Sequence, residues 1–242
     1  MTSLPAADRI LDLHDALAGA GPARRATLLI EAGDGVDPAT AAARPLGMID
    51  ADLLRLHERW FGPHLTAQAR CPSCAATLDV ALDAASLAGS VTAAPTEHTV
   101  TRGDITAIVR PLTLADLATA EGLSPRDARR ALLRSGLVSV RRRGKRCDIA
   151  GLPAEAEPWL VGALATVDPQ ADLVVALACG DCGTAWEERL DVSAFLVARL
   201  AAMAARLIDE VHQLATAYGW TETTILGLSG RRRMQYLERA AA

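Results

Sequence analysis

Apolar residues recur at steps of three and four along the first part of the chain. This spacing predicts a helix over residues 3–17, capped by Ser3, and another over residues 50–61 that Gly62-Pro63 ends. A shorter helix is expected after Pro22. The stretch 33–44 is rich in Ala, Asp, Gly and Pro, so we expect a loop there.

The middle of the chain changes to an alternating pattern and then returns to helical signals. Short alternating runs on either side of Gly103-Asp104 predict a β-hairpin over residues 99–110. Two short helices are expected next. Thr113 begins the first, and Ser124, followed by a proline in the first turn, begins the second.

The last fifty residues are predicted to be helical. Ser193 can cap a long helix whose apolar seam needs a partner surface, either the core of the same chain or another chain. Thr221 and Ser229 each begin a further short helix. Arg231 to Arg233 fall in the first turn of the last helix, where cations oppose the helix macrodipole, so an acidic partner is expected nearby. The seam consists of Leu196, Leu200, Met203, Leu207, Val211 and Leu214.

Two CxxC pairs stand at a constant offset within this framework. Cys71 and Cys74 form the first, Cys179 and Cys182 the second, and the residues after each pair also match at a shift of 108, with a strand predicted behind each. Two such turns facing each other would supply four thiolates in a tetrahedron, the arrangement of a structural Zn²⁺ site. We therefore expect one structural zinc per chain.

Two other interpretations of the cysteines fit less well. A redox dithiol is typically a single pair at a helix start, whereas strands are predicted after both pairs here. Structural disulfides belong to oxidising compartments, and no secretory signal follows Met1, so we expect a reducing cytoplasm. Cys147 has no spaced partner and is interpreted as a free thiol.

Catalytic signals are weak. Four thiolates close the coordination shell of a metal, which leaves no position for a reacting water. The histidines lie outside metal-recruiting and nucleophile motifs, and the cluster of Asp209, Glu210 and His212 is best explained as a solvated helix face. The sequence thus predicts no enzyme activity and no small-molecule substrate.

Length and composition bound the remaining possibilities. The chain has 242 residues, of which 50% are hydrophobic, enough for a substantial core, and it has no apolar run that would span a membrane. Its net charge is −4, so no overall positive field attracts it to nucleic acid or anionic lipid.

One segment nevertheless favours nucleic acid. Residues 112–138 look like a helix-turn-helix with four arginines on the second helix, and the basic turn 141–146 could serve as a wing. Two capped helices and an exposed basic turn are also common in other proteins, and the chain is poor in aromatic residues. A zinc-ribbon DNA-binding regulator is therefore the alternative function.

These elements together predict an α+β fold. Helical N- and C-terminal parts would surround a small β zinc-ribbon-like core made of the two CxxC knuckles. The expected divisions are 1–64 (N-terminal helices), 65–92 (first knuckle), 93–172 (hairpin, two short helices and basic turn), 173–192 (second knuckle) and 193–242 (C-terminal helices).

The order of several local motifs carries a resemblance to a known family. It comprises Arg59-Trp60-Phe61-Gly62, the first knuckle, the run from Val109 to Leu117, the second knuckle with Leu190 to Leu196, Glu210 to Ala215, Tyr218-Gly219-Trp220-Thr221-Glu222 with Ile225-Leu226-Gly227-Leu228, and Arg231-Arg232-Arg233-Met234-Gln235-Tyr236-Leu237. From about Leu53 onward the chain resembles the baseplate-protein family of T-even-type contractile phages, whose relatives occur in phage-tail-like contractile injection clusters.

The resemblance implies a non-enzymatic role. The chain would be a structural or chaperone-like assembly protein of a contractile tail baseplate or hub, either incorporated in the particle or released after assembly. Its partners would be baseplate, hub or tape-measure proteins. Trp220, Glu222, Arg232 and Tyr236 are the candidate contact residues, since aromatic and arginine side chains carry much interface energy. Trp220 and Tyr236 could equally pack the last helices together.

Overall fold

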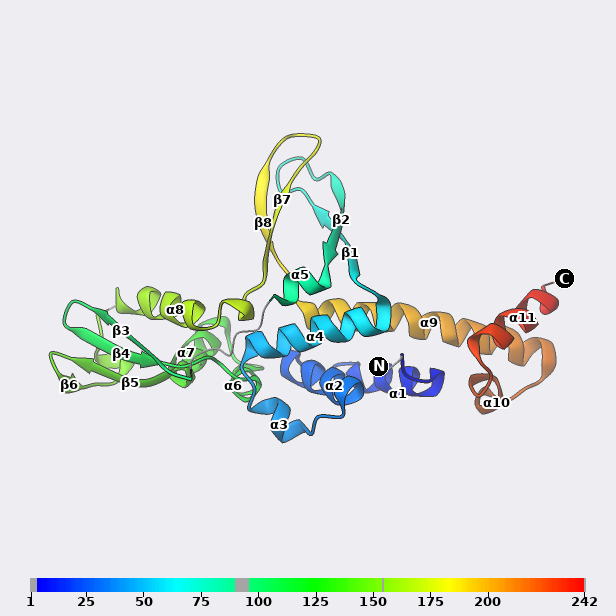
Figure 1. The fold of residues 1–242 in the computed structure, drawn as a ribbon, viewed down its shortest axis with the longest axis horizontal. Coiled ribbons are helices and arrows are strands. Elements are labelled where there is room, and N and C mark those ends of the chain that lie inside the picture. The colour runs from blue at the N-terminus through cyan, green and yellow to red at the C-terminus, as the bar shows by residue number, and fades with distance from the viewer. Residues whose placement is uncertain (1–3, 90–95, 154, 242) are drawn as a thin grey trace.

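The computed structural model describes residues 4–89, 96–153 and 155–241, and it shows an elongated molecule (Figure 1). A helical body occupies the middle. Three parts project from it: a sheet lobe at one end, a tower of two β-hairpins on one side, and a pair of short helices at the other end. The mixture of helices with separate small sheets confirms the predicted α+β class, but the expected central β core is wrong: the main core is helical and the two knuckles project from it.

The helical body consists of α1 (Ala7–Leu17), α2 (Pro22–Asp34), α4 (Leu46–Phe61) and the first half of α9 (Val192–Tyr218). Helix α9 packs against the other three. Each helix buries one apolar face, because its large aliphatic residues return at steps of three or four. The fully enclosed side chains of this core include Leu29, Ile30, Leu53, Leu54, Leu56, Leu196 and Leu200.

Three helix boundaries differ from the sequence-based expectations. Helix α9 is capped by Asp191, which accepts a hydrogen bond from the Ala194 amide at 2.9 Å, so Ser193 is not the cap. The expected loop 33–44 contains the end of α2 and a short helix α3 (Pro38–Ala42), since an Asp-Pro pair is a good helix start. Helix α1 begins at Ala7 with Ala6 in the cap position, so the proposed cap Ser3, which itself lies outside the described residues, does not begin it.

Helix α4 begins at Leu46 rather than at the predicted Asp50, because its first turn is capped by a residue from a distant segment. Asp168 accepts a hydrogen bond from the Gly47 amide at 2.9 Å, across 121 positions of sequence. A Cβ atom at Gly47 would collide with the Asp168 carboxylate, so only glycine permits this approach. The cap ties the end of the sheet lobe to the helical body.

Asp50 lies one turn further along α4, beside two other carboxylates. Burial raises its pKa to about 7, and the charges of Asp191 and Asp168 add to the effect. The negative form of Asp50 is therefore costly in the folded protein above neutral pH.

The sheet lobe has a four-stranded antiparallel sheet in the order β3-β4-β5-β6. Its strands are β3 (His98–Arg102), β4 (Ile105–Val109), β5 (Leu137–Arg142) and β6 (Lys145–Arg146). The predicted hairpin at Gly103-Asp104 is confirmed. Helix α8 (Ala156–Val167), flanked by 3-10 turns η1 (Ile149–Gly151) and η2 (Pro169–Ala171), was not predicted. A second core lies here, of Ile105, Ala107, Leu133, Val140, Ala156 and Leu160.

Helices α6 (Leu114–Ala120) and α7 (Pro125–Gly136) join the lobe to the body. Thr113 caps α6, as predicted, and forms a capping box with Asp116. Arg110 holds both Asp116 oxygens, at 2.8 and 3.0 Å. Burial alone would raise the Asp116 pKa, but the hydrogen bonds from Arg110 and Thr113 outweigh it and lower the pKa.

The tower contains two antiparallel hairpins, each a separate two-stranded sheet. The first is β1 (His64–Arg70) with β2 (Thr77–Asp83), which leads into α5 (Ala84–Ala88), and the second is β7 (Val174–Ala178) with β8 (Ala185–Arg189). Strand β1 follows directly on α4 and β8 leads directly into α9, so the packing of these helices sets the spacing of the tower's base.

The C-terminal helices are α10 (Glu222–Leu226) and α11 (Gly230–Ala240), and their predicted caps Thr221 and Ser229 are confirmed. The expected acidic partner for the arginines of α11 is Glu210 on α9, which accepts from the buried Arg233 at 2.7 Å. Among the described residues, no helix is both long enough and apolar enough to cross a membrane.

The raised pKa of Asp50 predicts that Asp50→Asn increases the free energy of unfolding in a pH-dependent way. The unfolded-state pKa is near 3.8 and the folded one near 7, so ionisation lowers the free energy of unfolding as pH rises through this range. The variant should match the parent near pH 4 and exceed it by roughly 1–4 kcal/mol near pH 8. Urea unfolding at both pH values measures this.

Asp52→Asn on the same helix is the control. Asp52 pairs with Arg44 and Arg55 at 2.7 and 2.9 Å, so its loss should give no gain at the higher pH. Equal stability of the Asp50 variant and the parent near pH 8 would contradict a raised pKa at Asp50.

Candidate metal centre

The four spaced cysteines lie in the turns at the free end of the tower, where the two hairpins meet (Figure 1). Cys71 and Cys74 come between β1 and β2, and Cys179 and Cys182 between β7 and β8. Both pairs thus adopt the strand-flanked setting that their sequence surroundings predict. None of them begins a helix, as a thioredoxin-like dithiol would.

The two turns repeat one another in backbone geometry. The Cys71 amide donates to the Ala76 carbonyl at 2.9 Å, and the Cys179 amide donates to the Thr184 carbonyl at the same distance. Five residues into the repeat, Ala75 and Gly183 both have a positive φ, 62° and 73°. The sequence offset of 108 is therefore also a structural repeat. Ala75 carries a conformation that disfavours a Cβ, which indicates that the surrounding turn enforces it.

The thiols from the two turns form one cluster. The Cys71 and Cys182 sulfurs are 3.6 Å apart, as are those of Cys74 and Cys179. All four sulfurs lie within 4.8 Å of one another. A tetrahedral zinc with bonds of about 2.3 Å requires sulfur separations of about 3.8 Å. The donor set and its spacing therefore fit a Cys₄ zinc ion, and the two 3.6 Å contacts each link one hairpin to the other.

Burial divides the ligands into two kinds. The first cysteine of each pair, Cys71 or Cys179, is buried, and the second, Cys74 or Cys182, is exposed. Side-chain and backbone hydrogen bonds from Thr184 lower the pKa of Cys182 to about 6. At Cys74 the Ala76 backbone amide acts to lower the pKa, but the neighbouring thiols outweigh it and raise the pKa to about 12. All four thiols must lose their protons to bind zinc as thiolates, so zinc affinity is expected to rise with pH.

The apolar contact between the hairpins is thin. Side chains at alternate positions on each hairpin face a cavity of about 410 Å³ between them; they include Ala67, Val80, Leu82, Val175 and Leu177. Two-stranded hairpins are marginal on their own. Burial alone therefore holds the upper tower weakly, and the thiol cluster has the main part in joining its tips.

Cys147 stays apart from the cluster, as its lack of a spaced partner predicts. It is half-buried in the sheet lobe, and its Sγ lies 3.9 Å from the Val140 carbonyl oxygen. It therefore provides a matched control for substitution of the tower cysteines.

The candidate contact residues gather around the last two helices. Trp220 stacks on Tyr218 with ring centroids 4.8 Å apart, and Tyr236 meets Trp220 edge to face at the same separation. Trp220 and Tyr236 are half-buried, which supports their packing role, whereas Glu222 and Arg232 are exposed. A contact role for the four together stays a prediction.

The helix-turn-helix-like segment forms two helices, but only the second has a largely open face. Helix α6 packs against α2 and α3, while α7 buries only Leu133 and Gly136. Arg126, Arg130 and Arg134 on α7 are exposed, and Arg129 pairs with Glu157 at 3.0 Å.

One residue of the site has no signal in the sequence. Thr184 places its hydroxyl oxygen 3.3 Å from the Cys182 sulfur. The offset of 108 maps Thr184 onto Ala76, so the repeat that reveals the cysteines cannot reveal this contact.

Comparisons of the chain with protein-family models, with curated proteins and with solved structures find no match in any of the three.

Removal of one tower thiol should destabilise the protein strongly. Cys74→Ser is expected to lower the free energy of unfolding of the zinc-loaded chain by about 3 kcal/mol or more, because three ligands bind zinc less tightly and binding is coupled to folding. A strong chelator should destabilise the parent but have little effect on the variant. Denaturant unfolding with and without chelator measures both effects.

Cys147→Ser should keep the parent's stability within about 1 kcal/mol and keep its sensitivity to chelator. The metal clamp would be excluded if chelator left the parent's free energy of unfolding unchanged and Cys74→Ser were as stable as the parent.

Proposed function

We propose that the chain is a non-enzymatic structural or chaperone-like assembly protein of a contractile phage tail or phage-tail-like injection system, acting at the baseplate or hub with a structural zinc. The observation that carries this proposal is the thiol cluster that joins the tips of two hairpins. A closed four-thiolate shell leaves no open coordination position for a substrate, so its use is mechanical.

Residues of the motifs that carry the resemblance make salt bridges in this chain, which supports treating those motifs as parts of one fold. Arg110 and Asp116, from the run Val109 to Leu117, join the sheet lobe to the body. Glu210 and Arg233 belong to two different C-terminal motifs and form a salt bridge with each other. The motifs thus maintain one framework, and the surfaces between them are free to meet partners.

The elongated shape supports an adaptor role. The body holds three projections in different directions, so one chain can touch several neighbours in a large particle (Figure 1). The C-terminal projection carries the exposed Glu222 and Arg232 beside the aromatic cluster of Tyr218, Trp220 and Tyr236. Arginine next to aromatic rings is a frequent composition of interface hot spots.

The alternative function, a zinc-ribbon DNA-binding regulator, draws its support from α7. Its exposed arginines and the nearby basic turn could contact phosphates. Salt-dependent binding to duplex DNA would distinguish this function from tail assembly.

Co-expression of the tagged chain with hub and tape-measure proteins of a contractile tail from the same genome tests the proposal. We expect a stable complex with at least one of them, and we expect Arg232→Ala to weaken it by about tenfold or more. Quantitative co-purification and titration of the purified pair measure the loss.

Arg231→Ala is the matched control, since it removes an equally exposed arginine one position earlier in α11 and should have a much smaller effect. The absence of any complex, combined with tight salt-dependent binding to duplex DNA, would replace tail assembly with the regulator function.

A further inference from the structure

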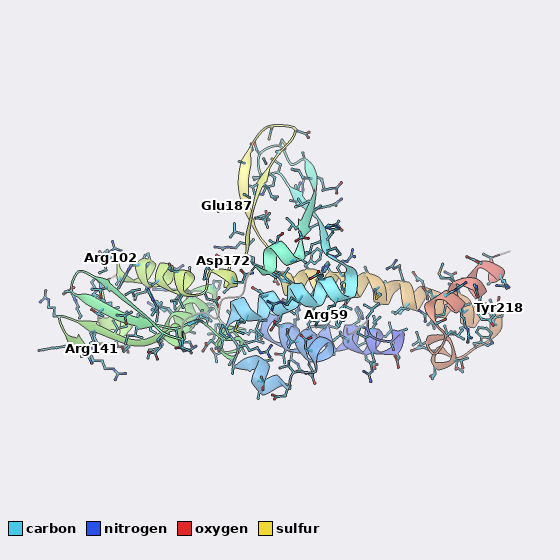
Figure 2. The ribbon with its side chains drawn as sticks, in the orientation of Figure 1. Arg59, Arg102, Arg141, Asp172, Glu187 and Tyr218 are labelled. Atoms are coloured by element: carbon cyan, nitrogen blue, oxygen red, sulfur yellow. The ribbon has the colours of Figure 1, made fainter. Side chains whose placement is uncertain are left out.

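Positive charge is concentrated in one part of this acidic chain. Residues 98–146 carry eleven Lys and Arg and four Asp and Glu, a net charge of +7, so that the remainder of the chain carries −11. These residues belong mainly to the sheet lobe. Figure 2 shows Arg102 and Arg141 at the end of the lobe farthest from the helical body, with Tyr218 at the opposite end of the molecule.

Some of these cations are neutralised within the lobe. Arg110 pairs with Asp116, Arg129 with Glu157, and both Arg142 and Arg143 with Asp104. Arg130, Arg134 and Arg146 are exposed and form no salt bridge with any described residue. These three arginines therefore retain their full capacity to bind an anionic group.

Arg130, Arg134 and Arg146 border one continuous hollow, which we call the lobe groove. It consists of two adjoining cavities of about 580 and 330 Å³ that share Arg134 and Ile149 as lining residues. Arg146 borders the larger cavity and Arg130 the smaller one. The groove lies between α7, strand β5 and the segment that follows β6.

The floor of the groove is apolar. Leu133 and Leu160 are buried at the base of the smaller cavity, and the exposed Val138 lines the larger one with 40% of its surface open. Other apolar lining residues are Leu137, Val140, Ile149, Leu152 and Pro153. The rim also carries two carboxylates, Asp148 and Glu157, but Glu157 is paired with Arg129, so among the described residues arginines outnumber the unpaired acid three to one. A hollow with a hydrophobic floor and a mainly cationic rim resembles the core and rim of a protein interface.

One wall of the groove is an uncovered strand edge. Strand β6 pairs with β5 only at Arg141 and Arg142, and beyond it the Cys147 amide donates to the Val140 carbonyl at 3.0 Å. Among the described strands, none pairs with the outer edge of β5 from Leu137 to Ser139. An extended segment that lies in the groove would therefore run along this edge.

We propose that the lobe groove binds an acidic segment of a partner protein in which carboxylates alternate with apolar side chains. The carboxylates would pair with Arg130, Arg134 and Arg146, and the apolar side chains would cover the floor. Arginine binds carboxylates through two parallel hydrogen bonds, which gives this pairing direction as well as strength.

Nucleic acid matches the groove less well than such a segment. A sugar–phosphate backbone would satisfy the arginines but would leave Val138 and the leucines uncovered, and no aromatic side chain lines either cavity for base stacking. The acidic character of the rest of the chain also opposes a long polyanion. The partner is thus distinguished by its combination of charge and apolar surface.

Synthetic peptides of about twelve residues test the proposal. The first alternates Glu with Leu, the second alternates Gln with Leu, and the third alternates Glu with Ser. At about 0.15 M salt we expect the Glu/Leu peptide to bind at least about tenfold more tightly than either of the others, by fluorescence anisotropy. Arg134→Glu combined with Arg146→Glu should lower its affinity by about tenfold or more.

Arg102→Glu combined with Arg141→Glu is the control, because it makes the same charge change on the same lobe outside the groove, and it should retain most of the affinity. Thermal unfolding of both double variants establishes that the lobe is intact.

Equal binding of the Glu/Leu and Gln/Leu peptides, or an equal loss of affinity in the control variant, would overturn the proposal. So would duplex DNA that binds more tightly than the Glu/Leu peptide and depends on the same two arginines. None of these results depends on Arg232, so the experiment tests the groove independently of the proposed tail contact at Arg232.

Discussion

The meeting of two hairpins through four thiols is the constraint on which the rest of the structure depends. The cysteines that face each other are separated by 105 and 111 positions of sequence, and the sheet lobe lies within that interval. Closing a loop of this length costs conformational entropy, and a metal ion bound only by the folded chain offsets that cost. A metal at this place would join the two hairpins that precede and follow the sheet lobe in the sequence.

The base of the tower is stabilised by apolar packing rather than by the thiol cluster. Phe61 of α4 and Phe195 of α9 both pack against the fully buried His57, each with its ring centroid 5.4 Å from that of the histidine. Burial, with the charge of Arg199 nearby, lowers the pKa of His57, so this ring is neutral and behaves as part of the core. The tower is thus fixed by apolar packing below and by the thiol cluster above, with little apolar contact between.

Much of this arrangement could be predicted from local sequence signals. The spacing of the cysteines predicted their clustering, and the residue pattern correctly predicted the helix starts at Thr113, Thr221 and Ser229. The misses have a common physical origin in contacts between distant segments. Asp168 caps α4 from 121 positions away, and Thr184 approaches Cys182 without a counterpart in the first knuckle. The lobe groove was equally invisible, since its arginines come from α7 and from the basic turn, and only the fold places them around one hydrophobic floor. Such contacts have no periodicity, so no local pattern reveals them.

X-ray absorption spectroscopy at the zinc edge, with metal content measured on the same purified chain, tests the central claim most directly. The account predicts one zinc per chain, surrounded by four sulfur atoms at about 2.3 Å. A chain that purifies without zinc and does not take it up, or a zinc ion with nitrogen or oxygen ligands in place of sulfur, would contradict it.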